Sequence, residues 1–269
     1  MSRATLFVAG VCLLAIAAHG RAQEKKPLKV FLLAGQSNMV GSAKADELPE
    51  ALRKTPPNVQ FAGRDGRLGP PRLEGRLGPE ISFAHAMAKA FPDEQIVIIK
   101  YARGGTSALA WSPEWTKEGA KITQNENVGP LFDHLMETLD RVKRRHDVEV
   151  VAMLWAQGGR DARFEKAAAQ YEQNLKKIIE AARKQVGKPE LPFILARTVD
   201  VPKTGFPHVD QVRQAQERIA NQDPHAVMIL TDDLSQLRDN IHFDTKGQIE
   251  QGERFAQALL EMLGDPSTK

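Results

Sequence analysis

Cysteine is almost absent from this sequence, which has one, Cys12, among 269 residues. Cys12 lies inside an apolar run near the N-terminus, from Leu6 to Ala18. The chain beyond this run cannot form disulfide bonds, so its stability must come from a hydrophobic core. The length that remains is enough for one sizeable domain, and we predict a single domain over residues 23–269.

An excess of charge of one sign is also lacking. The sequence has 37 Lys and Arg residues against 34 Asp and Glu residues, and two of the cations, Arg3 and Arg21, lie in the first 22 residues. It contains no basic tract with interleaved aromatic residues. Nucleic acid is therefore not an expected partner.

The sequence has no apolar run long enough to span a membrane comfortably. The run from Leu6 to Ala18 follows a short basic start, Met1 to Arg3, and precedes Gly20-Arg21-Ala22, which places small residues at the two positions that a signal peptidase reads. This pattern predicts a secretory signal peptide over residues 1–22 and an exported protein, periplasmic or secreted, that is not bound to a membrane after cleavage. An uncleaved anchor is the alternative interpretation.

What the sequence does contain is a strand-like run that ends in a polar cluster. Val30 to Ala34 is apolar at consecutive positions, which is typical of a strand buried on both faces of a parallel sheet. Gly35, Gln36, Ser37 and Asn38 follow at once. Open α/β sheets bind ligands at the carboxyl ends of their strands, so Ser37 could present its hydroxyl there. Alternatively, Ser37 only caps the segment that follows.

Strands and helices alternate along the rest of the chain. We predict further strands at 95–101, 148–155, 192–196 and 226–230, and helices at 80–91, 130–146, 165–186, 210–221 and 245–263. The segment from Ala43 to Pro79 is rich in Pro, Gly and Arg and is predicted to be a long loop. The alternation predicts an α/β fold with a five-stranded parallel sheet wrapped by helices.

Polar or glycine-rich clusters follow four of these five strands, at one edge of the predicted sheet. Each cluster alone has an ordinary structural explanation, such as a turn or a structural histidine near the start of a helix. Together they supply every part of a serine acyl-transfer site. The residues are Ser37, Gly104 with Gly105, Gln157, and Asp239 with His242.

Each residue of this set has a chemical role in such a reaction. Ser37 is the nucleophile, His242 is the base that takes its proton, and Asp239, three residues earlier, can hold the imidazole in the right tautomer. The backbone N–H groups of Ser37 and of Gly104 or Gly105, together with the side-chain amide of Gln157, can donate to a developing oxyanion.

The chain order Ser, Asp, His is that of the α/β-hydrolases, but the nucleophile lies in G-Q-S-N-M rather than G-x-S-x-G, so that fold is not indicated. The sequence instead resembles the SGNH hydrolase superfamily, and within it the sialate O-acetylesterase-like branch that includes carbohydrate esterase family six. The resemblance rests on GQSNM, on ARGGT with a following Trp, on W-x-QG-x-x-D and on DNIHFD, and it covers nearly the whole chain after residue 22.

This resemblance implies a flavodoxin-like three-layer α/β/α sandwich, no metal or other cofactor, and removal of acetyl groups from sugars. By position it assigns the triad to Ser37, Asp239 and His242. One departure is visible, because the third block of the family usually reads Q-G-E and Gly159 stands here in place of the Glu. Asp161 still matches the acidic residue two places on.

Residues around these blocks are candidates for substrate binding. Trp111 could stack on a sugar ring or could be a packing anchor. Arg103 and Arg160 could bind substrate oxygens or a carboxylate, or could pair with Asp161. The full set of candidates is Gln36, Asn38, Arg103, Trp111, Arg160 and Asp161.

We therefore predict an exported serine esterase that deacetylates carbohydrates through an acyl-Ser37 intermediate. A lipid or arylester hydrolase on the same fold is one alternative, which the lack of a long apolar lid segment disfavours. A catalytically inactive carbohydrate-binding homologue is another. It is suggested only by Gly159, and the intact set of Ser37, Asp239 and His242 argues against it.

Overall fold

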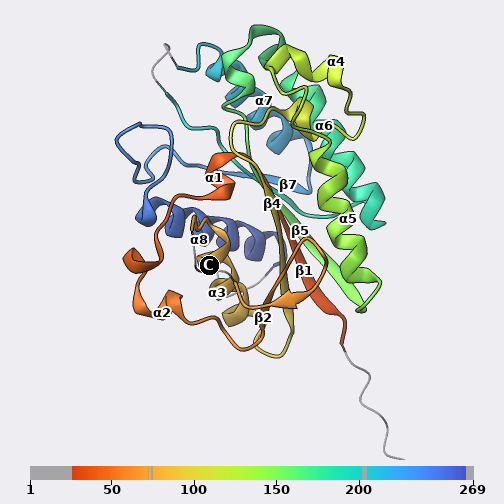
Figure 1. The fold of residues 1–269 in the computed structure, drawn as a ribbon, viewed down its shortest axis with the longest axis vertical. Helices are drawn as coiled ribbons and strands as arrows, with labels where there is room; N and C mark the ends of the chain where they lie inside the picture. The colour runs from red at the N-terminus through yellow and green to blue at the C-terminus, as the bar shows by residue number, and fades with distance from the viewer. Residues whose placement is uncertain (1–25, 72, 74, 202–204, 265–269) are drawn as a thin grey trace, which may run out of the picture.

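The computed structural model describes residues 26–71, 73, 75–201 and 205–264. A seven-stranded sheet forms the centre of the molecule, in the order β3-β2-β4-β1-β5-β6-β7 (Figure 1). Neighbouring strands are parallel except for β2 and β3. The strands are β1 Leu28–Gly35, β2 Val59–Ala62, β3 Leu68–Gly69, β4 Ile96–Ala102, β5 Val148–Ala156, β6 Phe193–Ala196 and β7 Ala226–Ile229. The predicted signal peptide, 1–22, lies outside the described residues.

The α/β class and the three layers are confirmed, and all five predicted strands are present, but the described sheet has seven strands, one pair of them antiparallel, rather than the five parallel strands predicted. The prediction of a continuous loop from Ala43 to Pro79 was wrong in part, because β2 and β3 lie within it. β2 extends the sheet beside β4, and β3 pairs with β2 in the antiparallel sense. These strands have four and two residues, too few to show a periodicity among the surrounding Pro and Gly residues.

Helices cover both faces of the sheet, and β1 supplies alternate residues to each face. Val30, Leu32 and Ala34 join the core under α5, α6 and α7, whereas Phe31 and Leu33 join the core under α3 and α8 (Figure 1). The α-helices are α1 Ser37–Val40, α2 Glu50–Arg53, α3 Glu80–Ala90, α4 Lys117–Ala120, α5 Leu131–Lys143, α6 Glu165–Val186, α7 Val209–Gln222 and α8 Thr245–Met262. Among the described helices, none combines the length and the apolar character that a membrane crossing needs.

Gly35 makes the close approach that places Ser37 at the sheet edge. Its φ is 147°, and a Cβ atom there would lie 2.2 Å from the carbonyl oxygen of Ala156 at the end of β5. The next residue, Gln36, donates its backbone N–H to that same oxygen at 2.8 Å. The chain therefore leaves β1 in a sharp turn, and α1 begins at Ser37.

Replacing Gly35 by Ala should destabilise the fold by about 3 kcal/mol or more, because the added methyl group meets backbone and the φ value disfavours a side chain. Urea unfolding measures the loss. Gly69→Ala in β3 is the matched control, since nothing lies within 4 Å of a Cβ atom at that position. A loss for Gly35→Ala no larger than that of the control would contradict the packing described above.

Candidate active site

Ser37 and His242 line one open cavity of about 270 Å³ at the carboxyl edge of the sheet. Ser37 is the first residue of α1, directly after β1, and its side chain is partly exposed. His242 reaches the cavity from the segment between β7 and α8. The structure thus brings together the predicted nucleophile and the predicted base from opposite ends of the chain.

Asp239 holds both the ring of His242 and the loop that carries it. Its Oδ2 lies 2.6 Å from Nδ1 of His242, and its Oδ1 accepts the backbone N–H groups of Ile241 and His242, each at 2.9 Å. Partial burial opposes ionisation of this carboxyl, but the hydrogen bonds from His242 and Ile241 outweigh it, so the pKa of Asp239 lies below its ordinary value. An ionised Asp239 fixes the ring so that Nε2 is the free nitrogen.

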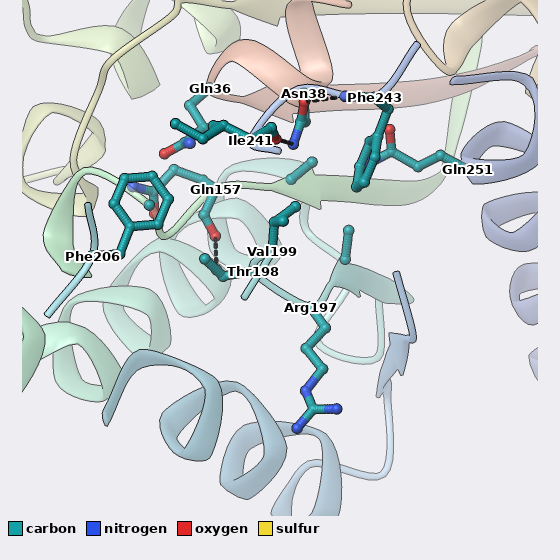
Figure 2. A pocket seen from close by; sticks show the side chains of 13 residues that line it. Gln36, Asn38, Gln157, Arg197, Thr198, Val199, Phe206, Ile241, Phe243 and Gln251 are labelled. Atoms are coloured by element: carbon teal, nitrogen blue, oxygen red, sulfur yellow. Dashed lines mark hydrogen bonds between the residues drawn. The ribbon is translucent and has the colours of Figure 1, made fainter. Parts of the chain in front are cut away.

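Asn38 joins the segment of His242 to the turn of Ser37. Its Nδ2 donates to the carbonyl of Ile241 at 3.0 Å, and its Oδ1 accepts the N–H of Phe243 at 3.3 Å, as Figure 2 shows. Asn38 as a whole is 9% exposed. We predicted substrate binding for Asn38, whereas the structure uses its amide to position the two residues that flank His242.

Gly104 and Gly105 follow β4 and border the same cavity. A Cβ atom at Gly104 would lie 3.8 Å from Cβ of Ser37. Within the described part of the chain, the backbone N–H groups of Ser37, Gly104 and Gly105 have no hydrogen-bond acceptor. These donors are therefore available to an oxygen atom bound beside Ser37.

Gln157 has a different environment from the one that an oxyanion donor requires. Its Nε2 donates to the carbonyl of Thr106 at 2.8 Å and to Oδ2 of Asp161 at 2.6 Å. It lines a small inner cavity of about 20 Å³ rather than the cavity of Ser37 (Figure 2). Both N–H groups of the amide are therefore engaged, and the predicted oxyanion role has no support in this arrangement.

Asp161 and Trp111, two predicted substrate contacts, are fully buried. Asp161 accepts the N–H of Ala108 at 3.0 Å besides the Gln157 amide, and burial raises its pKa to about 7. Trp111 donates to Oγ1 of Thr106 at 3.2 Å and packs edge-on against another core tryptophan. Neither side chain can touch a substrate, so both predictions are corrected to structural roles.

The other predicted substrate contacts differ in their placement. Gln36 borders the cavity, and its Oε1 accepts the N–H groups of Gly158 and Arg160, each at 3.3 Å. Arg160 also lines the cavity, whereas Arg103 is exposed and does not. Of the six candidates, Gln36 and Arg160 thus line the cavity that Ser37 and His242 share.

Sequence reasoning missed Arg76, Arg163 and Phe206, which also line the cavity. Phe206 explains the unusual Gly159, because a Cβ atom at that position would lie 2.9 Å from the Phe206 ring and 3.0 Å from Nε2 of Gln36. The ring fills the space that a side chain at position 159 would need. No local pattern marks these residues, since each reaches the site from a separate loop.

Among the described residues, no group of three or more His, Cys, Asp and Glu side chains is arranged to hold a metal ion.

Three comparisons place the chain among known proteins. A family model described as carbohydrate esterase, sialic acid-specific acetylesterase, matches residues 27–261. A probable carbohydrate esterase of Arabidopsis thaliana is 26% identical over 186 residues, which cover 68% of this chain and 64% of the plant protein. The match thus spans less than two thirds of the length of that relative.

Solved structures share the fold. An X-ray structure of an Arabidopsis thaliana protein has a TM-score of 0.74 at 23% identity and covers 88% of this chain and 99% of its own. A carbohydrate acetylesterase from Xanthomonas citri has a TM-score of 0.65 at 19% identity and covers 88% of this chain and 57% of its own. At these identities the likeness establishes the fold alone.

The contacts of Asp239 lead to a prediction about kcat. Asp239→Asn should lower kcat by about 10⁴-fold, because the ring of His242 would be held in the wrong tautomer and no second carboxylate can stand at Gly159. Steady-state kinetics on an aryl acetate measure the effect. Asp233→Asn, at an exposed aspartate that pairs with Arg254, is the control. If Asp239→Asn keeps more than about a tenth of the wild-type kcat, Asp239 does not support the histidine.

Burial of Asp161 leads to a prediction about stability. The pKa is about 7 in the folded protein against an ordinary 3.8, so the folded state holds the proton more tightly and the free energy of unfolding falls as the pH rises between these values. From about pH 5 to about pH 8, wild type should lose about 2–3 kcal/mol more than Asp161→Asn. Urea unfolding at both pH values tests this, with Asp133→Asn as an exposed control. Equal pH dependence in wild type and Asp161→Asn would contradict it.

Proposed function

This chain belongs to the carbohydrate esterase, sialic acid-specific acetylesterase family, and from that membership we propose that it hydrolyses O-acetyl esters of carbohydrates with Ser37 as the nucleophile. Membership places it among the carboxylic ester hydrolases. The observation that carries the mechanism is that Ser37 and His242 share one cavity while Asp239 lies 2.6 Å from the imidazole.

In the acylation step, Oγ of Ser37 attacks the acetyl carbonyl carbon, and Nε2 of His242 takes the hydroxyl proton. The carbonyl oxygen becomes an oxyanion, which the backbone N–H groups of Ser37 and of Gly104 or Gly105 can stabilise. Collapse of this tetrahedral intermediate breaks the bond to the sugar oxygen. The imidazolium then returns the proton to that oxygen, so the sugar leaves as an alcohol and acetyl-Ser37 remains.

In the deacylation step, His242 takes a proton from water, and the resulting nucleophile attacks the acetyl-Ser37 carbonyl. Collapse of the second tetrahedral intermediate breaks the bond between the acetyl carbon and Oγ of Ser37, the imidazolium of His242 returns its proton to that oxygen, and acetic acid leaves. Asp239 stabilises the imidazolium in both steps and stays ionised itself. The proposal leaves Gln157 out of the oxyanion donors, because Thr106 and Asp161 already use its N–H groups.

The packing around Gly159 removes the only observation that suggested a catalytically inactive homologue. Phe206 fills the space at that position, so Gly159 has a structural reason that does not involve loss of activity. The residues that we propose to catalyse ester hydrolysis remain Ser37, Asp239 and His242.

Acetate release from acetylated xylan, acetylated pectin and O-acetylated sialic acid tests the proposal. Wild type should release acetate from at least one of them, and Ser37→Ala should reduce kcat by about 10⁵-fold or more, because the covalent step has no substitute. Ser112→Ala, at a serine outside the cavity, should keep wild-type activity. A fluorophosphonate should label Ser37 alone. Activity that survives in Ser37→Ala would exclude the acyl-serine mechanism.

The same assay separates carbohydrate esterase from lipid hydrolase. Acetyl esters should be hydrolysed with higher kcat/KM than octanoyl esters of the same alcohol. The reverse order would favour the lipid alternative over the carbohydrate assignment.

A further inference from the structure

A lysine lies inside the otherwise uncharged strand β4. Lys100 is the only charged residue of that strand, and it is in register with Leu33 of β1, whose side chain belongs to the core under α3 and α8. Paired residues of neighbouring strands point to the same face of a sheet, so the lysine side chain enters the same layer. An ammonium group in such surroundings is costly unless its charge is paired. Lys100 therefore requires a partner inside the molecule.

The partner of Lys100 is Glu80, in the first turn of α3. Nζ of the lysine lies 2.5 Å from Oε1 of the glutamate, and the two side chains are 22% and 6% exposed. The same oxygen accepts the backbone N–H of Gly78 at 3.1 Å. Among the described residues, no second carboxylate lies within 4.0 Å of Lys100. The two charges thus form an ion pair that is largely removed from water.

The ammonium group of Lys100 also holds the turn that carries Ser37. Its Nζ donates to the carbonyl of Val40 at 3.1 Å, and Val40 is the last residue of α1. This helix has four residues, begins at Ser37 and has no side-chain cap at its N-terminus. A helix so short has little stability of its own, so its position depends on contacts with the rest of the fold.

Hydrogen bonds within α1 carry this restraint to Ser37. Val40 donates its backbone N–H to the carbonyl of Gln36 at 2.9 Å, and Gly41 donates to the carbonyl of Ser37 at 2.8 Å. A displacement of Val40 would therefore also displace the nucleophile. Lys100 acts at the exit of the turn, whereas the bond from Gln36 to the end of β5 holds its entry.

The start of α3 packs directly on the end of α1. A Cβ atom at Gly78 would lie 2.7 Å from the carbonyl oxygen of Met39 and 2.7 Å from Oε2 of Glu80, so a side chain does not fit there. The carbonyl oxygens at the end of α1 and the carboxylate of Glu80 all carry negative charge. Lys100 is bonded to both sides. The cation therefore joins two groups that would otherwise repel each other.

We propose that Lys100, anchored by Glu80, is a positioning residue for the nucleophile, because it fixes the end of α1 and thereby the place of the Ser37 hydroxyl. This inference rests on the proposed function, since it concerns the same serine. Neither Lys100 nor Glu80 lines the cavity of Ser37, so the pair acts through α1 and not on a substrate. Apolar side chains of similar size could fill the same space, but they could not donate to the carbonyl of Val40.

The test replaces the pair as a unit, because Lys100→Met alone would leave a buried carboxylate without its cation. Lys100→Met/Glu80→Gln should lower kcat on an aryl acetate by about tenfold or more and change KM by less than about twofold, since a displaced nucleophile slows the chemical step and not substrate binding. The rate at which a fluorophosphonate labels Ser37 should fall by a similar factor.

Arg183 and Asp223 provide a matched ion pair away from the site. They lie 2.6 Å apart, their side chains are 14% and 21% exposed, and they join α6 to the residue that follows α7. Arg183→Met/Asp223→Asn should lower the midpoint of urea unfolding but keep kcat within about twofold of wild type. Kinetics at a temperature where both double variants are folded separate a loss of stability from a loss of position.

Two results would overturn the inference. One is a folded Lys100→Met/Glu80→Gln variant whose kcat lies within about twofold of wild type, and the other is an equal loss of kcat in the Arg183 and Asp223 control. If the first double variant does not fold, Glu80→Gln decides, because it keeps the shape of the side chain and removes the anchoring charge. It should lower kcat by about threefold at unchanged KM, and an unchanged kcat would overturn the inference. None of these results touches the proposed function, which fails instead if Ser37→Ala retains ester hydrolysis.

Discussion

The amide of Asn38 holds the candidate site together. Its two hydrogen bonds, to Ile241 and Phe243, clamp the residues on either side of His242 onto the turn that carries Ser37. The two segments lie at opposite ends of the chain and share no strand pairing that would align them. Because Asn38 is largely buried, water competes little for these bonds. The amide of Asn38 therefore helps to fix the position of His242 relative to Ser37, together with the hydroxyl of Ser42, which donates to the carbonyl of Phe243.

Buried polar groups also decide which donors remain free. Asp161 is fully buried and takes one N–H of Gln157, while the carbonyl of Thr106 takes the other. A buried carboxylate is costly unless it is hydrogen-bonded, so Gln157 serves Asp161 and not a bound substrate. In the described part of the chain, the backbone N–H groups of Ser37, Gly104 and Gly105 remain without an acceptor at the cavity. The amide of Gln157 thus satisfies groups of the loops after β4 and β5 and takes no part in the proposed chemistry.

At the opening of the cavity, aromatic rings rather than carboxylates lie against the guanidinium groups of Arg160 and Arg163. Phe206 rests on Gly159 and lies beneath Arg163, and Phe164 supports Arg160 in the same manner. Rings fix the direction of a guanidinium while its charge persists. The ring of Phe206 therefore lies against both Gly159 and the guanidinium of Arg163.

Local patterns in the sequence determined the five longer parallel strands, the helices that cover them, and the positions of Ser37, Asp239 and His242, because buried parallel strands are recognisable as apolar runs and their carboxyl ends meet at one edge. The reach of Asp239 to His242 was predictable as well, since the two residues are three positions apart in the sequence. Only the tertiary structure decided that Asn38 is a clamp, that Gln157 and Asp161 satisfy each other, that Trp111 is core, and that Arg163 and Phe206 belong to the site. These roles depend on partners from distant segments of the chain. The residues next to a side chain in the sequence do not indicate which distant group will form hydrogen bonds with it.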